Sequence, residues 1–489
     1  MLIDVHEGEE ATMPRRPSGG SLLDRLVFHG LLVVIVLAPL PFGSSRPWSW
    51  SLLAVLVALL LIGWVISCIR PSVVLGGLPV PARLLRGEII LFLATVCWAW
   101  LQTGSSVPEA WIHPVWREAA AALDLSLAGS ISVYPFATVT AIMRLLTYGG
   151  VFWLSLQFCR RSRYGWRLLH WQMTAGLIYA LYGLFVYFSP MGSRFFRTIL
   201  WFDKWAYHDD LTGTFVNRNH CATYLGLSLL VTLVLLVNAL RQRLWELGYD
   251  RKNALRHLFQ AILERGLFYI FNMMIMGTAL LQTHSRMGVT ATAMAFSATL
   301  LLVALAGLLP KRTGFTLVLG SGVLLLPVIF LSGGGLWHRL VSEQFDNRSA
   351  LFSVVLEAFS ASPWLGTGYG SFPVVFDLYR DLRLPEAVFY FDAHNTYLEN
   401  GLELGLIGGG MLLVLMIALV FRHAVGLFRR ERRQVFPLLA LVASLQVGIH
   451  ALVDFSVQIP AVAVLYAALL GAGTAQSWSS RVLLPPGQR

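Results

Sequence analysis

The sequence predicts an all-α integral membrane protein that crosses the bilayer about twelve times. Its 489 residues are 56% hydrophobic and only 13% charged, and the mean hydropathy is +0.66. Soluble globular domains are far less apolar than this. The long apolar segments are hydrophobic on all sides, which indicates helices rather than the alternating strands of a membrane barrel.

Each expected span is an apolar run long enough to cross about 30 Å of hydrocarbon. In chain order the spans are 27–44, 51–69, 88–103, 139–158, 169–189, 221–240, 266–283, 289–308, 314–333, 395–421, 435–452 and 456–475.

Lysine and arginine predict the orientation. If residue 1 lies inside the cell, about 25 of the 37 Lys and Arg residues fall in the inner loops and the termini, as the positive-inside rule requires. Both termini are therefore expected in the cytoplasm. The net charge of +11 follows from this topology, so we predict contact with membrane lipids and no nucleic-acid partner.

The chain is expected to consist of one transmembrane domain, 21–476, between cytoplasmic tails at 1–20 and 477–489. The first tail is polar and is predicted to be disordered. Outside the membrane lie three loops, near 104–138, 190–220 and 334–394. The third has about sixty residues and its own helix, capped by Asp346 and Asn347; loops of that length are usually functional.

Four motifs carry a resemblance to a known family. They are Gly213-Thr-Phe-Val-Asn217-Arg218-Asn219-His220, Ser285-Arg286-Met-Gly288, Pro363 with Gly366-Thr-Gly368, and His394-Asn395 followed by Gly405 and Gly408. With these motifs the chain resembles the O-antigen ligase and O-antigen polymerase superfamily of bacterial membrane glycosyltransferases. The His394 motif is the most specific of the four.

The resemblance implies an enzyme of the bacterial inner membrane that acts in lipopolysaccharide or surface polysaccharide biosynthesis. Such an enzyme moves a preassembled glycan from undecaprenyl pyrophosphate to an acceptor hydroxyl on the periplasmic face. It also implies inversion at the anomeric carbon and no metal or other cofactor. The His208-Asp209-Asp210 triplet is the one candidate metal ligand set, and it is also ordinary surface chemistry.

Three arginines are candidates to bind the pyrophosphate. Arg218 and Arg286 are expected at the outer ends of helices, and Arg348 in the first turn of the loop helix. A guanidinium stays charged and donates paired hydrogen bonds to phosphate oxygens. Alternatively, Arg218 and Arg286 only reach the lipid headgroups, and Arg348 pairs with Asp346.

His394 and Glu399 are the catalytic candidates. His394 can accept a proton from the attacking hydroxyl, or it can bind the pyrophosphate as a cation. Glu399, one turn into the same helix, is a second proton acceptor or a partner of the histidine; it can also pair with an arginine. Asn217, Asn219, Asn395, Gly405 and Gly408 are expected to form the scaffold of the site.

Two questions stay open from the residues alone. The acceptor can be the lipid A core, as for a ligase, a second lipid-linked repeat, as for a polymerase, or a protein hydroxyl. An ion-coupled transporter is the alternative from another class, because Arg144, Glu399, Glu403 and Asp454 are charged groups at membrane depth. A transporter would require paired broken helices in two related halves, and the sequence has no such repeat.

Overall fold

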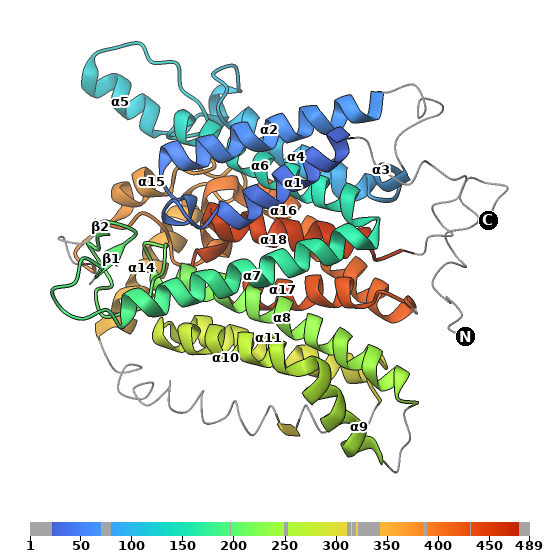
Figure 1. Ribbon diagram of the computed structural model, residues 1–489. Helices are drawn as coiled ribbons and strands as arrows, with labels where there is room; N and C mark the ends of the chain where they lie inside the picture. The colour runs from blue at the N-terminus through green and yellow to red at the C-terminus, as the bar shows by residue number, and fades with distance from the viewer. Residues whose placement is uncertain are drawn as a thin grey trace.

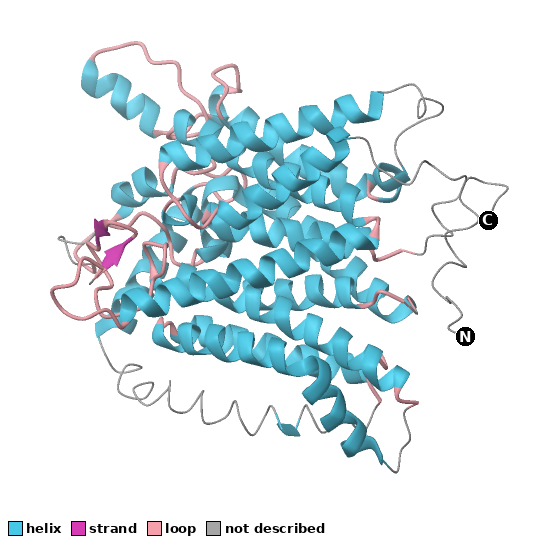
Figure 2. Ribbon diagram, in the orientation of Figure 1, coloured by secondary structure: helices cyan, strands magenta, loops and turns pink. Residues whose placement is uncertain are grey.

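The computed structural model describes residues 22–69, 80–195, 197–248, 253–310, 343–384, 389–430 and 432–478, together with Gly314, Leu319 and Gly320. These residues form an all-α bundle whose long helices run side by side (Figure 1). Two antiparallel strands of two residues each are the only sheet among the described residues (Figure 2). The predicted fold class is confirmed.

The elements are α1 (Leu22–Leu37), α2 (Pro47–Ile69), α3 (Val80–Leu84), α4 (Arg86–Gln102), α5 (Val115–Leu123), α6 (Pro135–Cys159), α7 (Ser162–Tyr187), β1 (Thr198–Ile199), β2 (Phe202–Asp203), α8 (Arg218–Glu246), α9 (Ala254–Ala261), α10 (Leu267–Gln282), α11 (Arg286–Leu305), α14 (Glu343–Ala361), α15 (Phe372–Tyr379), α16 (Thr396–Arg429), α17 (Val435–His450) and α18 (Pro460–Ala475). Short helical turns occur at Phe42–Ser44, Glu109–Trp111, Ile262–Gly266 and Ser456–Gln458.

Helix α8 forms the centre of the bundle. Its side chains are apolar on every side and are buried along nearly its whole length. It packs against α7, α10, α11 and α17, and α18 packs between α17 and α6. A helix that is hydrophobic all round is expected to be enclosed by other helices, and α8 is.

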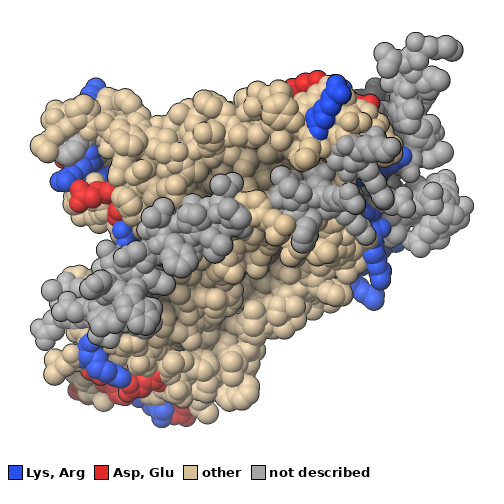
Figure 3. Space-filling view, turned by 90° about the horizontal axis from the view of Figure 1, so that it is seen from below, with Lys and Arg blue, Asp and Glu red and all other residues tan. Residues whose placement is uncertain are grey.

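The three predicted outer loops gather at one end of the bundle, which we call the loop end. There lie α5, the β1–β2 hairpin, α14 and α15, whereas α3 and α9 lie at the opposite end (Figure 1). On the face shown in Figure 3, charged side chains cluster at the two ends and an uncharged band separates them. That distribution is typical of a protein that spans a bilayer.

Within the described residues, six segments are long and apolar enough to cross a membrane: Pro47–Cys68, Pro135–Cys159, Arg218–Glu246, Leu255–Gln282, Arg286–Leu305 and Thr396–Arg429. Shorter apolar helices, such as α17 and α18, complete the bundle. The predicted span 314–333 lies outside the described residues, apart from Gly314, Leu319 and Gly320.

Some predicted boundaries are wrong. The loop helix α14 begins at Glu343, so Asp346 and Asn347 lie inside the helix instead of capping it. The helix after the His394 motif continues to Arg429, eight residues beyond its predicted end. Polar residues in the last turns of a membrane helix do not stop it, because the helix can project from the hydrocarbon into the interface.

Helix α16 is broken at Gly405, whose φ of 66° and ψ of 178° are non-helical. The break frees three carbonyl oxygens from their helical partners. The freed oxygens accept from Thr367 N–H (3.0 Å, on Leu402), from Gly368 N–H (2.9 Å, on Glu403) and from the Trp98 ring N–H (2.8 Å, on Leu404). Residues 363–368 of the third loop are thereby fastened to α16.

Replacing Gly405 by alanine is expected to destabilise the protein by about 1–3 kcal/mol or more, because only glycine adopts this backbone conformation without strain. The added methyl would also overlap the carbonyl oxygen of Trp364. The apparent Tm in detergent should fall by several degrees. Gly410→Ala is the matched control, because a methyl at Gly410 meets no atom within 4 Å. Equal Tm values for the two variants would contradict this account.

Candidate functional site

A buried carboxylate, Asp454, joins the ends of four helices at the loop end. It lies between α17 and the turn that precedes α18, and it is fully buried. Its Oδ2 accepts from Asn219 Nδ2 at 2.6 Å, and its Oδ1 accepts from Ser456 N–H at 2.8 Å. Its carbonyl oxygen accepts from Thr396 Oγ1 at 3.1 Å. The starts of α8 and α16 are therefore both held at the end of α17.

Asn219 extends this junction to α11. Its Oδ1 accepts from Ser285 Oγ at 2.7 Å, and Ser285 is the residue that caps α11. Arg218 and Arg286 are the first residues of α8 and α11. The structure thus brings the starts of these two helices together, with their predicted arginines. Positive helix ends and guanidinium groups both favour an anion.

Arg218 is held by an acid of the second loop. Its Nη1 donates to Asp210 Oδ2 at 2.9 Å, and His284 Nδ1 lies 2.8 Å from Asp210 Oδ1. The Arg218 guanidinium also lies over the Tyr207 ring, 5.6 Å from its centre. Asp210, considered in the sequence as a candidate metal ligand, is instead an ion-pair partner here.

The second loop also buries a lysine. Lys204 Nζ donates to the Asp210 carbonyl oxygen at 2.9 Å, and burial lowers the pKa of this ammonium group. The backbone and the side chain of Asp210 thus hold cations from three parts of the chain.

His394 lies immediately before α16 in a left-handed conformation, with φ of 52°. Its ring centre is 5.1 Å from that of Phe455, and His220 of α8 contacts the same phenyl ring at 4.8 Å. Asn395 caps α16 through its Oδ1, which accepts from the N–H groups of Tyr397 and Leu398 at 3.0 and 3.1 Å. The asparagine of the motif therefore fixes where the helix starts and where the histidine is presented.

The histidines around Asp454 stabilise its charge. Burial by itself raises the pKa of Asp454, but positive charge on His450, His220 and His394 and the Ser456 hydrogen bond outweigh burial, so its pKa is held below the usual value. An ion pair with an arginine was a natural expectation for this acid. The structure gives it hydrogen-bond donors and histidines instead, and these place an ionised acid near His394.

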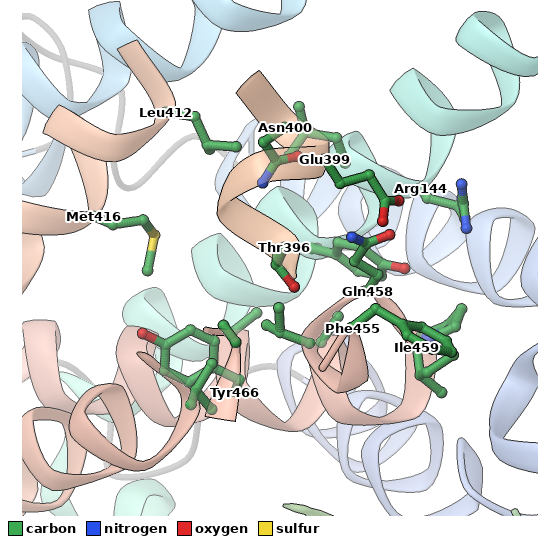
Figure 4. A pocket seen from close by; sticks show the side chains of 18 of the residues that line it. Arg144, Thr396, Glu399, Asn400, Leu412, Met416, Phe455, Gln458, Ile459 and Tyr466 are labelled. Atoms are coloured by element: carbon green, nitrogen blue, oxygen red, sulfur yellow. The ribbon is translucent and has the colours of Figure 1, made fainter. Parts of the chain in front are cut away.

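Glu399 positions the turn that carries His394. Its side chain is buried, and its Oε2 accepts from Ala393 N–H at 2.8 Å, with a further hydrogen bond to Gln458. Figure 4 shows Glu399 and Arg144 on one side of a cavity, with Gln458 below Glu399. The structure therefore puts Glu399 beside the backbone of the His394 turn and within the electrostatic influence of Arg144.

Glu403 and the two motif glycines hold the third loop in place. Glu403 Oε1 accepts from Phe372 N–H at 2.9 Å, at the start of α15. A methyl on Gly405 would overlap the loop backbone, and one on Gly408 would overlap the Trp98 ring. The residues between Pro363 and Phe372 therefore pack directly on α16.

A large cavity of about 1790 Å³ opens beside this junction. Its polar lining includes Arg144, Asn217, His220, Asp392 and Glu399. Arg218, Arg286 and His394 do not line it. Phe455, which both His220 and His394 contact, forms part of its wall. The candidate site therefore has a cavity side and an arginine side, with Phe455 between the two histidines.

Three residues of the site were not singled out for function in the sequence. Asp392 precedes His394 by two residues and faces the cavity; burial and the nearby charges of Glu399 and Asp454 raise its pKa well above the usual value. Arg144 and His220 also face the cavity. The spacing of Asp392 from the His394 motif was a usable signal. Arg144 comes from a helix more than 240 positions away, so no local pattern reveals it.

Arg348 lies in the second turn of α14 and not in its first. Its side chain lies outside the described residues, so its predicted contact with a pyrophosphate stays a prediction. Asn217 caps α8, accepting from Asn219 N–H at 2.8 Å. Asn219, expected to cap the same helix, instead directs its side chain to Ser285 and Asp454.

The fold and the site define an all-α membrane protein with a buried polar junction at one end. Residues 271–413 match the family model of the O-antigen ligase. The matched segment contains the Ser285, Pro363 and His394 motifs and supports the assignment of the chain to the O-antigen ligase superfamily. No curated protein matches the chain. The match and the apolar helices indicate a bacterial membrane enzyme of the glycosyltransferase type, related to lipopolysaccharide synthesis.

Replacing Asn219 by alanine is expected to destabilise the junction by about 1–3 kcal/mol, because Asp454 and Ser285 each lose a buried hydrogen-bond partner. The apparent Tm in detergent measures this loss. Asn272→Ala is the control: Asn272 is equally buried, and its printed bond is to Phe268 in the same helix, at 2.7 Å. The junction is not a structural hub if Asn272→Ala lowers the Tm as much as Asn219→Ala.

Asp392→Asn is expected to make stability less dependent on pH. Because the folded pKa of Asp392 is raised, the folded state holds the proton more tightly than the unfolded chain. The acid therefore contributes stability at low pH, which is lost as pH rises from about 4 through the raised folded pKa. The amide abolishes that loss, so the Tm of the variant should exceed that of the wild type near pH 8. A variant whose Tm declines with pH as the wild type does would contradict the assignment.

Proposed function

We propose that this protein transfers a preassembled glycan from undecaprenyl pyrophosphate to an acceptor hydroxyl on the periplasmic face of the bacterial inner membrane. The loop end is then the periplasmic end, and both termini are cytoplasmic. The observation that carries the proposal is the junction of α8 and α11. Two helices that each begin with an arginine are tied together there by the Asn219–Ser285 hydrogen bond.

Arg218 and Arg286 hold the pyrophosphate in this proposal. Guanidinium groups donate paired hydrogen bonds to phosphate oxygens, and the positive ends of α8 and α11 add to their attraction. The salt bridge to Asp210 keeps the Arg218 guanidinium in place before the donor arrives. Negative charge grows on the pyrophosphate as it departs, so the same groups stabilise the transition state more than the ground state.

His394 prepares the acceptor. The acceptor oxygen attacks the anomeric carbon from the side opposite the pyrophosphate and passes its proton to His394. The new carbon–oxygen bond forms while the bond to the phosphate oxygen breaks, and the pyrophosphate leaves with the electron pair. This single displacement inverts the anomeric configuration and is proposed to proceed without a metal. The ionised Asp454 stabilises His394 once it has gained the proton.

Glu399 is the positioning residue for His394. Its bond to Ala393 N–H fixes the turn in which His394 has a positive φ. The turn is strained for a residue with a side chain, and strain of this kind is held by its surroundings. Glu399→Gln keeps the size but weakens this acceptor. The variant should lower the rate of transfer more than the affinity for either substrate.

The transporter alternative receives less support. It requires paired broken helices in two related halves. Among the described α-helices, α16 is the one with a non-helical residue inside it.

Transfer should fall by about 10²–10⁴-fold in His394→Ala, the range typical for loss of a general base. Arg286→Lys should also be impaired, because lysine keeps the charge but loses the paired hydrogen bonds. The measurement is the lipid-linked and finished glycan of a deletion strain complemented with each variant. His170→Ala is the matched control, because His170 is exposed and bonds Trp166 O within its own helix.

The intermediates identify the reaction. Long chains that accumulate on undecaprenyl pyrophosphate indicate a ligase, and single repeats indicate a polymerase. Full complementation by both His394→Ala and Arg286→Ala would reject the site. A product with retained anomeric configuration would reject the single displacement.

A further inference from the structure

The cavity beside the junction is too large for one sugar. Its volume of about 1790 Å³ exceeds the range of roughly 300–1,000 Å³ in which most small-molecule pockets fall. It follows α16 from Glu399 at the loop end to Val420. At a rise of 1.5 Å per residue this is about 30 Å, the thickness of the hydrocarbon layer.

The deep part of the cavity is apolar. Below the break at Gly405 its lining from α16 is Leu412, Leu413, Met416, Leu419 and Val420. Leu470 of α18 and Phe152 of α6 complete the channel. Such a lining solvates a hydrocarbon chain and offers nothing to a sugar or a peptide.

The mouth of the cavity is polar, and Arg144 is its cation. Arg144 lies over the Trp50 ring, with its guanidinium carbon 5.2 Å from the ring centre. Among the salt bridges of the described residues none involves Arg144. Figure 4 shows its guanidinium beside the carboxylate of Glu399, with Asn400 on the next position of α16. Donors, acceptors and an aromatic ring thus face one space, as sugar binding requires.

The charge at the mouth disfavours a pyrophosphate. The charge of Arg144 acts on three acids, Asp392, Glu399 and Glu403, and all three line the cavity. One cation among three acids repels a multiply charged anion, whereas sugar hydroxyls can donate to carboxylates and accept from guanidinium. Arg218 and Arg286 do not line this cavity.

We propose that this cavity binds the acceptor, as a sugar carried on a long hydrocarbon chain. Arg144, Glu399 and Asn400 hold the sugar, and the channel below Gly405 holds the chain. The inference rests on the proposed transfer, because it assigns the second substrate of that reaction. It identifies the acceptor class as a glycolipid and excludes a protein hydroxyl.

Photo-crosslinking to the full-length protein in lipid nanodiscs tests this proposal without turnover. The probe is a β-glucoside of farnesol with a diazirine at the far end of the chain. We expect labelling within 412–420 of α16, with competition by unlabelled farnesyl glucoside and not by free glucose or farnesyl pyrophosphate. Competition by farnesyl pyrophosphate instead would make the channel the site of the donor chain and overturn the proposal, as would labelling that free glucose displaces equally well.

Variants locate the site. Gly410 lines the cavity, and a methyl there meets no atom within 4 Å. Gly410→Trp should therefore fold and fill the channel, reducing labelling by about tenfold or more, a difference of 1.4 kcal/mol in binding. Gly410→Leu should have a smaller effect. Gly277→Trp is the matched control, because a methyl at Gly277 on α10 also meets no atom; equal loss in both would refute the location.

Arg144→Gln should weaken the competition by unlabelled farnesyl glucoside while farnesol itself competes as before. Unchanged competition by the glucoside would remove Arg144 from the subsite. His394→Ala separates this inference from the proposed function. The variant should lose transfer and keep the labelling, so labelling without any transfer in the wild type would sink the reaction but not the binding site.

Discussion

The geometry of the site depends on one buried carboxylate, Asp454. Helices α8, α11 and α16 all begin near it, and each directs the positive end of its dipole toward the junction. A buried acid is costly unless donors and positive charge surround it. Here Asn219 and Ser456 supply the donors, and the histidines supply the charge. The same convergence of helix ends creates a field that favours a second anion, which is why the arginines lie where a pyrophosphate can be bound.

The break in α16 is the second constraint, because it fastens a long loop to the membrane core. A continuous helix would satisfy its own carbonyl groups and leave the loop nothing to bind. At Gly405 the freed carbonyls take donors from residues 367–368 and from α4, where Gln102 Nε2 donates to the Glu403 and Leu365 oxygens at 2.9 and 2.8 Å. The loop is therefore part of the wall of the site, and Glu399 and Glu403 keep fixed positions above the channel.

Hydropathy was enough to predict the all-α bundle, because a bilayer demands long apolar helices whatever their arrangement. The local motifs also revealed their own ends: Asn217, Ser285 and Asn395 each cap the helix that follows. What could not be predicted was which ends meet. The Asn219–Asp454 bond joins residues 235 positions apart, and the proximity of Arg144 to Glu399 depends on how α6 packs in the bundle. Loop helix α14 was misplaced at its start for a simpler reason, since Asp346 is acceptable both as a cap and inside the first turns.

The distribution of charge explains how one membrane site can hold two lipid-linked substrates without exchanging them. Two arginines and two helix ends lie on one side of Phe455, and three acids around one arginine lie on the other. A polyanionic donor is attracted to the first side and repelled by the second, whereas a neutral glycolipid is not excluded from the acidic side. Apolar burial cannot make this distinction, because both chains are equally at home among apolar helices. Electrostatics therefore sorts the substrates, and His394 lies at the boundary that the acceptor hydroxyl must reach.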